Sequence, residues 1–145
     1  MKLRVLALDY DGTIAEHGRL SEAVRDALAA VRERGVAIVL ATGRILDDLR
    51  DVAGDLSFAD AVVAENGAIV VLQGTAPRLL CHEASPAFMG ALERRGIAFR
   101  SGRCVVEADA EDAVRLLPVI RSVELPLGLT FNRGRVMALP PGVCK

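Results

Sequence analysis

Two aspartates stand two residues apart in the segment LDYDGT, directly after a short apolar run at residues 3–8. A continuous apolar run of this length is typical of a strand buried on both faces. Alternate residues of a strand point to the same side, so Asp9 and Asp11 should converge where the strand ends. Gly12 lets the backbone turn closely past them. Two neighbouring carboxylates repel each other, and a divalent cation is the simplest compensation.

The composition predicts an aliphatic core. The chain has 145 residues, which suits one domain or a small domain with an insertion. Hydrophobic residues make up 52% and the mean hydropathy is +0.33, but only 3% of the residues are aromatic and tryptophan is absent. Such a core must be built from Val, Leu, Ile and Ala, as in parallel sheets covered by helices.

Charge and cysteine content exclude several classes of partner. The net charge of −1 and the scattered arginines give no sign of a nucleic-acid surface or a basic membrane patch. The sequence opens with no signal segment and contains no apolar run of membrane-spanning length. Cys81, Cys104 and Cys144 lack metal-like spacing, and His17 and His82 are isolated. We therefore expect a cytoplasmic protein with reduced thiols and with neither a nucleic-acid nor a membrane partner.

The first half of the sequence alternates strand and helix patterns. A helix should follow the N-cap Ser21 and end near Gly35, because Val24, Leu28 and Val31 form one apolar stripe. Further patterns are a strand at 36–43, a shorter helix at 45–56 and a strand at 60–67. This order, with buried strands, is the signature of a doubly wound parallel sheet.

From residue 68 the pattern changes to short strands and hairpins. We expect a hairpin at 68–82, a helix capped by Ser85, strands at 97–100 and 103–108, and a hairpin around residues 132–134. A second helix should follow Asp109 and end or kink near Pro118. Residues 80–137 thus form a small α/β layer of their own.

Four motifs follow one another along the chain. DYDGT ends the first strand, ATGR the second and ENGA the third, and LPPGVCK closes the sequence. Together they resemble the haloacid dehalogenase superfamily of phosphohydrolases, in its Cof-like and sugar- or glycolate-phosphate phosphatase branch. The resemblance covers the whole chain and implies a Rossmann-like α/β core from residues 1–79 and 138–145. The core is incomplete at its C-terminal end, and residues 80–137 form a small inserted α+β cap.

The same resemblance implies a Mg²⁺-dependent phosphoric monoester hydrolase that acts on a small phosphorylated metabolite. Asp9 would attack phosphorus to form an aspartyl-phosphate, and Asp11 would protonate the leaving oxygen and then activate water. The Asp9 carboxylate and the Asp11 carbonyl would hold magnesium. Thr42 would hydrogen-bond a phosphoryl oxygen and Lys145 would neutralise charge. The residues expected near the substrate are Gly12, Thr13, Gly43, Arg44 and Asn66.

The sequence allows two interpretations of the role of several residues. Arg44 either caps the following helix or meets the substrate. Glu65 and Asn66 either form a turn before a hairpin or lie near the substrate. Cys144 is a packing residue beside the motif lysine or, less simply, a reactive thiol.

The sequence departs from the pattern of this family at its C-terminal end. Relatives continue past the motif lysine to an acidic motif, G-D-x-x-N-D, that completes the magnesium site, whereas this sequence stops at Lys145. We expect a portion or a truncated form of a longer phosphatase. Its first strand would have an open apolar edge, which favours a homo-oligomer or an element swap.

Two alternatives to a phosphatase stay open. One is a catalytically weak member of the family that binds phosphate compounds or a partner chain without efficient turnover. The other is a phospho-receiver domain, although receivers cluster their acidic residues differently and have no insertion of this kind.

Overall fold

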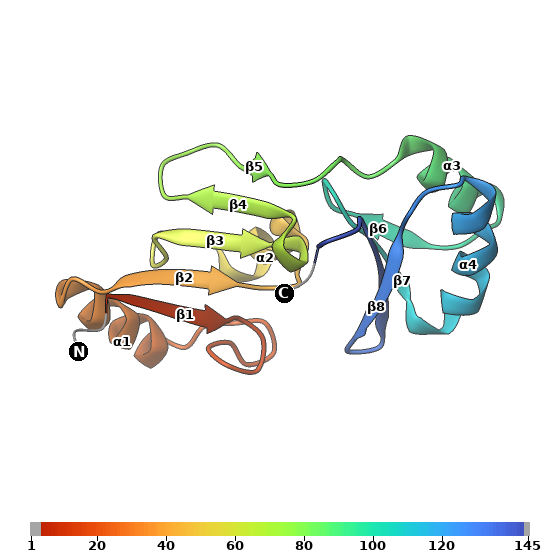
Figure 1. Cartoon of the computed structure of the whole chain (residues 1–145). Helices are drawn as coiled ribbons and strands as arrows, with labels where there is room; N and C mark the ends of the chain where they lie inside the picture. The colour runs from red at the N-terminus through yellow and green to blue at the C-terminus, as the bar shows by residue number, and fades with distance from the viewer. Residues whose placement is uncertain (1–3, 144–145) are drawn as a thin grey trace. The chain divides into compact units, whose positions relative to one another are not determined.

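The chain forms two compact units, residues 4–80 and residues 81–143 (Figure 1). The structure is a computed structural model that describes residues 4–143. The first unit joins a largely parallel sheet to two helices, and the second joins a separate antiparallel sheet to two helices. This arrangement confirms the predicted α/β class. No helix within residues 4–143 is long and apolar enough to cross a membrane.

Five strands form the sheet of the first unit, in the order β1-β2-β3-β4-β5. Strands β1, β2 and β3 are parallel, and β4 and β5 are added antiparallel. The bounds are Val5–Asp9 for β1, Ala37–Ala41 for β2, Ala61–Ala64 for β3, Ile69–Leu72 for β4 and Arg78–Leu79 for β5. The three parallel strands therefore end at the same edge of the sheet.

Two helices connect the parallel strands. Helix α1 spans Glu22–Glu33, and its N-cap Ser21 accepts a hydrogen bond from Val24 N at 3.3 Å, as predicted. Helix α2 spans Leu46–Ala53. Both crossovers proceed in the same direction along the sheet, so right-handed connections place both helices on one face, behind the sheet in Figure 1.

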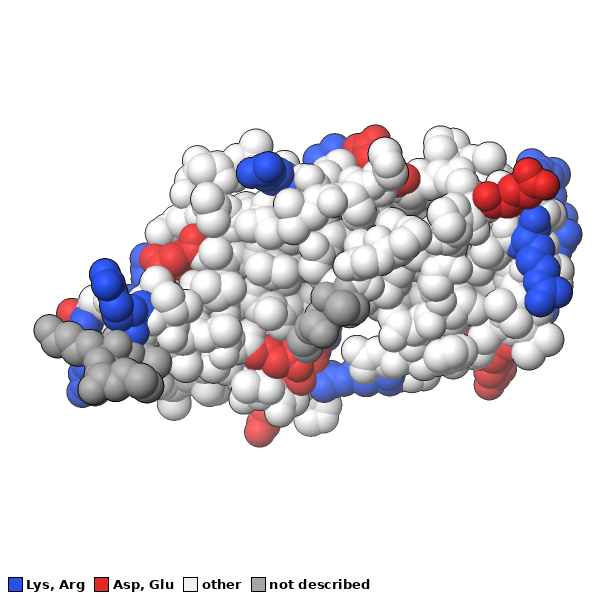
Figure 2. Space-filling model, in the orientation of Figure 1, with Lys and Arg blue, Asp and Glu red and all other residues white. Residues whose placement is uncertain are grey.

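Burial alternates along the strands because only one face is covered by helices. Ile38, Leu40, Val62 and Ala64 are at most 4% exposed. The residues between them in β2 and β3 point to the other face and are half-buried. That other face is lined by small aliphatic side chains and carries few charges over β1 to β4 (Figure 2).

Strand β1 differs from the sequence expectation. A strand buried on both faces was predicted, but Val5 is 53% exposed and Ala7 is also exposed. The reason is positional: in the described part of the chain, β1 pairs with β2 alone and lies at the sheet edge. Apolar composition indicates a strand that can be buried, and it does not fix which strand lies in the centre.

The second unit packs two helices against an antiparallel sheet of order β6-β7-β9-β8. The bounds are Pro86–Arg94 for α3, Phe99–Ser101 for β6, Val106–Asp109 for β7, Ala113–Ser122 for α4, Gly128–Asn132 for β8 and Arg135–Leu139 for β9. The core contains Phe88, Leu92, Leu116, Val119 and Val136. Strand β9 runs past residue 137, where the sequence placed the end of the cap, and residues 138–143 belong to this unit.

Of the two outcomes predicted near Pro118, an end or a kink, the end is not observed, because helix α4 continues to Ser122. Proline removes one backbone hydrogen bond, to the carbonyl of Val114. Pro118 is exposed and Val114 is 78% exposed, so water can satisfy that carbonyl. The buried residues Val119 and Ile120 follow directly and favour continuation of the helix.

Asp60 joins three strands at the amino end of β3. Its Oδ2 accepts a hydrogen bond from Ile38 N at 2.8 Å, and its Oδ1 accepts one from Arg32 Nη2 at 2.9 Å. Its backbone N–H donates to Ile38 O at 2.9 Å, and its carbonyl accepts from Gln73 N at 2.9 Å. The bond from the Ile38 N–H is the largest of the causes that hold the pKa of the Asp60 carboxyl below its ordinary value.

This lowered pKa predicts a pH dependence of stability. The folded state binds the Asp60 proton less readily than the unfolded state, so the stabilisation is complete above the ordinary carboxyl pKa of about 3.9 and is lost as pH falls through the lower folded value. In urea unfolding between neutral pH and acid, Asp60→Asn should be less stable than wild type near neutrality. The difference should shrink on acidification. Asp26→Asn, on exposed α1 surface, is the control, and a pH-independent difference for Asp60→Asn would contradict the assignment.

Candidate active site

The first aspartate lies at the end of β1 and is oriented locally. Asp9 pairs across the sheet with Ala41, the last residue of β2, and is half-buried. Its Oδ1 accepts a hydrogen bond from Tyr10 N at 2.8 Å. The carboxylate thus lies beside the residues that follow β2, at the carboxyl edge of the parallel strands, where α/β sheets generally bind ligands.

The segment after β1 folds into a compact loop built on Tyr10. The Tyr10 carbonyl accepts hydrogen bonds from Ile14 N at 3.1 Å and Ala15 N at 2.9 Å, and its hydroxyl donates to Gly18 O at 2.9 Å. Burial raises the pKa of the Tyr10 phenol. The ring is completely buried, so the side chain between the two aspartates is the anchor of the loop.

Gly12 and Thr13 lie in this loop and are exposed. Gly12 has φ of 74°, a left-handed conformation that favours glycine, as the turn required. Its N–H donates to Ala15 O at 3.0 Å, and the Thr13 N–H is 3.4 Å from Tyr10 O. The amide of Gly12 therefore closes the loop.

The second aspartate forms an ion pair with the ATGR motif. Arg44 Nε lies 2.6 Å from Asp11 Oδ2, and Arg44 Nη2 lies 2.7 Å from Asp11 Oδ1. Hydrogen bonding to Asp11 is the largest of the causes that raise the pKa of Arg44. Of the two roles that the sequence left open for Arg44, capping of α2 by its side chain is not observed, since its guanidinium binds Asp11. The role toward a substrate stays a prediction.

Thr42 and Gly43 connect the second motif to the third. Thr42 is 2% exposed, and its Oγ1 accepts a hydrogen bond from Arg44 N at 3.1 Å. Asn66 N donates to Thr42 O at 3.2 Å, and Glu65 N donates to Arg44 O at 2.9 Å. These backbone bonds hold the loop after β2 against the loop after β3.

Glu65 and Asn66 lie in a strained turn directly after β3. Their φ values are 53° and 56°, in the left-handed region that non-glycine residues seldom adopt. Glu65 is 1% exposed, although it is a carboxylate. Backbone strain of this kind clusters at functional sites. The sequence could identify the turn, but it could not show that the turn packs against Thr42 and Gly43.

The structure brings most of the sequence-predicted residues to one edge of one sheet. The gathered residues are Asp9, Asp11, Gly12, Thr13, Thr42, Gly43, Arg44 and Asn66. Lys145 lies outside the described residues. Tyr10 and Gly18 were missed by sequence reasoning, although the position of the chain's single tyrosine between the two aspartates was a signal. Within residues 4–143, no group of three or more His, Cys, Asp or Glu side chains is placed to hold a metal ion.

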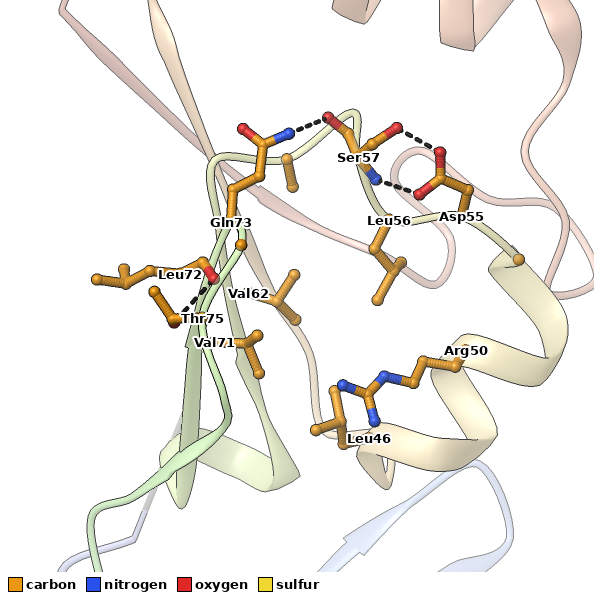
Figure 3. A pocket seen from close by; sticks show the side chains of 13 residues that line it. Leu46, Arg50, Asp55, Leu56, Ser57, Val62, Val71, Leu72, Gln73 and Thr75 are labelled. Carbon is orange, nitrogen blue, oxygen red and sulfur yellow. Dashed lines mark hydrogen bonds between the residues drawn. The ribbon is translucent and has the colours of Figure 1, made fainter.

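A separate cavity lies at the other end of the first unit (Figure 3). Its volume is about 510 Å³, and it is bounded by α2, the turn before β3 and the turn after β4. Leu46, Leu56, Val62 and Val71 line it with apolar surface, and the polar rim includes Arg50. None of the motif residues after β1, β2 or β3 lines this cavity. The chemistry of the motifs therefore lies elsewhere.

Comparison with known proteins identifies the family. A family model of haloacid dehalogenase-like hydrolases matches residues 6–87, more than half of the chain. The chain belongs to this family, as the resemblance of its motifs indicated.

Curated relatives include phosphatases of several kinds. The chain is 41% identical over 71 residues to a putative phosphatase, YxeH, of Bacillus subtilis, which covers 46% of the chain and 26% of the relative. It is 34% identical over 99 residues to a phosphoglycolate phosphatase of Methanosarcina mazei, covering 68% of the chain and 39% of that protein. A phosphoglycolate phosphatase of Methanosarcina acetivorans is 29% identical over 139 residues, which cover 96% of the chain and 55% of that protein. The chain thus spans about half or less of these relatives.

Solved structures share the fold of the chain. A haloacid dehalogenase-like hydrolase from Bacteroides thetaiotaomicron aligns over 98% of the chain and 73% of its own, with a TM-score of 0.71 and 16% identity. A subclass IIB sugar phosphatase of the superfamily aligns over 97% of the chain and 71% of its own, with a TM-score of 0.62 and 17% identity. These likenesses confirm the fold class, with a part of each larger structure left unmatched.

The contact between Gly43 and Asn66 yields a prediction. A Cβ on Gly43 would lie 3.0 Å from Asn66 Oδ1, and the backbone bonds between the two loops oppose their separation. We expect Gly43→Ala to lower the free energy of unfolding by about 1–3 kcal/mol, the usual range for overpacking. Denaturant unfolding measures this.

The matched control for this prediction is Gly128→Ala. Gly128 has an ordinary φ, and a Cβ there meets no atom within 4 Å. Its stability should stay within about 0.5 kcal/mol of wild type, as is usual for surface substitutions. Equal stability of the Gly43 and Gly128 variants would show that the Asn66 side chain moves away from Gly43 easily.

Proposed function

We propose that the chain is a magnesium-dependent phosphoric monoester hydrolase, or the part of one that carries its reacting residues. The observation that supports this most is the meeting of DYDGT and ATGR at one sheet edge, with Asp9 beside the end of β2 and Asp11 bonded to Arg44. Membership of the haloacid dehalogenase-like hydrolase family agrees with phosphoryl transfer. Because the chain spans only part of its relatives, the activity of the whole protein belongs to this proposal.

Asp9 is the proposed nucleophile. One of its carboxylate oxygens forms a bond to phosphorus while the bond from phosphorus to the leaving oxygen breaks, which gives an aspartyl-phosphate. The hydrogen bond from Tyr10 N to Asp9 Oδ1 orients the carboxylate before reaction.

Asp11 is the proposed general acid and base. It gives a proton to the leaving oxygen in the first step, and takes one from the water that attacks phosphorus in the second. The second step releases inorganic phosphate and restores the Asp9 carboxylate. Asp11 is suited to this because its side chain is 15% exposed, so it is sheltered but within reach of solvent.

The oxygen atoms at the end of β1 fit a magnesium ion. The Asp9 carboxylate and the Asp11 backbone carbonyl are hard oxygen ligands, which Mg²⁺ prefers, and Mg²⁺ commonly keeps several waters besides one or two carboxylates. When bound, the ion would neutralise negative charge on the phosphoryl group. Thr42 and the substrate-side residues Gly12, Thr13, Gly43 and Asn66 complete the proposed phosphate surroundings, and Lys145 keeps its predicted role in charge neutralisation.

The proposed substrate is a small phosphorylated metabolite. Relatives are named phosphoglycolate phosphatases, and one solved relative is a sugar phosphatase. The second unit, residues 81–143, would be the cap that selects among such esters. The alternative is a chain that binds phosphate compounds without efficient turnover.

Hydrolysis of p-nitrophenyl phosphate by the 145-residue chain tests this proposal. We expect turnover that requires Mg²⁺, is abolished by a chelator and is lost in Asp9→Asn, because an amide is a poor nucleophile. Asp60→Asn, a carboxylate at the opposite end of the sheet, should retain turnover. Phosphate binding by folded protein without any turnover would support the alternative and exclude the hydrolase for this chain.

We further propose that the 145-residue chain, taken alone, covers its open sheet face with a second copy of itself. Val5 and Leu72 are 53% and 54% exposed on the face that lacks helices, and the strand partners between them are aliphatic. Two such faces match each other because the paired residues in the middle of each are aliphatic, with Asp9 and Arg78 only at the ends of the strands.

Sedimentation over a wide range of concentration tests this association. We expect wild type to dimerise as concentration rises, and the double variant Val5→Glu, Leu72→Glu to stay monomeric, because each charge would be buried without a partner. A matched control is Val114→Glu, which alters an equally apolar residue, 78% exposed, on α4 of the other unit. A wild-type monomer at all concentrations contradicts the proposal.

A further inference from the structure

We propose that Arg44 is the positioning residue of Asp11: it fixes the plane of the acid–base carboxylate and does not serve as the main phosphate ligand. This inference rests on the proposed function, because it assigns Arg44 to a step that Asp11 performs. It follows from the two contacts of 2.6 and 2.7 Å between the guanidinium and both carboxylate oxygens. Two parallel N–H···O bonds define the orientation of both planar groups, which one bond would not.

Arg44 can act as a fixed reference because it is itself held on several sides. Its guanidinium carbon lies 5.8 Å from the centre of the Tyr10 ring, within the range of a cation–π contact. On another side lies Gly18, where a Cβ would approach Arg44 Nη2 to 3.3 Å. The Arg44 side chain is 28% exposed. The buried Tyr10 ring and the Gly18 backbone thus limit the positions that the guanidinium can take.

The backbone of Arg44 is fixed as well. Its N–H donates to Thr42 Oγ1 at 3.1 Å, and its carbonyl accepts from Glu65 N at 2.9 Å. Arg44 therefore links the loops after β2 and β3 to the side chain of Asp11 in the loop after β1. Arg44 and Asp11 are 33 residues apart in the sequence, so this bond joins two loops that are distant along the chain.

This bond does not prevent Asp11 from reacting. A carboxylate offers about four lone-pair sites, and the fork occupies two of them. The Nε and Nη2 groups of Arg44 are directed at Asp11, so the phosphate must be bound chiefly by other groups. A lysine could not take the place of Arg44, because its ammonium is a point charge without the planar fork.

The inference predicts that the effect of Arg44 depends on the leaving group. A general acid matters for an ester with a poor leaving group, such as phenyl phosphate, and little for one whose leaving group departs without a proton, such as 2,4-dinitrophenyl phosphate. In the full 145-residue chain with Mg²⁺, Arg44→Met should lower kcat for phenyl phosphate by about 10–100-fold, a part of what a general acid contributes. KM should change little, and kcat for 2,4-dinitrophenyl phosphate should fall much less. Arg44→Lys should resemble Arg44→Met.

The matched control is Arg32→Met. Arg32 also pairs with a carboxylate of the first unit, Asp60, at 2.9 Å, but at the opposite end of the sheet. Its side chain is 33% exposed, against 28% for Arg44. Its removal should leave the ratio of the two kcat values as in wild type. A change in the ratio that appears in Arg44→Met alone is therefore specific to the pair with Asp11.

Two kinetic outcomes would overturn the inference. An increase in KM and an equal loss on both esters in Arg44→Met would make Arg44 a substrate ligand. An unchanged ratio of the two kcat values, with stability lowered as in Arg32→Met, would make it a purely structural residue.

Crystal structures of the wild type and of Arg44→Met separate this inference from the proposed function. If wild type has no Asp9-dependent turnover, the hydrolase proposal fails, and the positioning role is decided by the structures alone. We expect the Asp11 side chain to leave its wild-type rotamer or to occupy several positions in Arg44→Met, while Asp9 and Thr42 stay in place. An unmoved Asp11 would refute positioning, whatever the activity.

Discussion

Parallel pairing of β1, β2 and β3 is the constraint on which the rest of the site depends. The register that sets Asp9 beside Ala41 and Ala41 beside Val63 brings the three strand ends to one line. Each of the motifs DYDGT, ATGR and ENGA follows one of these ends directly, so the pairing alone gathers residues from three distant parts of the sequence. The backbone bonds from Asn66 to Thr42 and from Glu65 to Arg44 then join the loops to one another.

Within that frame, the side chains divide into those that support and those that react. Tyr10 is buried and shapes the loop between the two aspartates, while its ring supports the Arg44 guanidinium. Arg44 in turn binds both oxygens of Asp11. Support of this kind keeps a carboxylate in place without consuming all of its lone pairs, and catalysis of phosphoryl transfer depends largely on such positioning. The strain at Glu65 and Asn66 fits the same pattern, since the surrounding bonds hold a conformation that the turn would not adopt freely.

The opposite end of the sheet is built for stability. Asp60 satisfies backbone groups of β2 and receives Arg32, and the cavity beside α2 shares no residue with the motifs. The sheet face without helices is a further consequence of topology, because two crossovers in the same direction must cover the same face. Apolar side chains on the other face therefore stay half-exposed in this chain.

The sequence by itself determined the α/β class, the order of most elements, the N-caps at Ser21 and Ser85 and the family, because these rest on local spacing, capping chemistry and short motifs. It also placed Asp9 and Asp11 at a strand end. Only the tertiary structure decided that β1 lies at an edge, that α4 passes through Pro118 and that Arg44 binds Asp11 instead of capping a helix. The reason is that strand order, burial and contacts across thirty residues depend on how the elements pack together. A pattern of neighbouring residues shows which face can be buried, but what lies against it is a property of the whole fold.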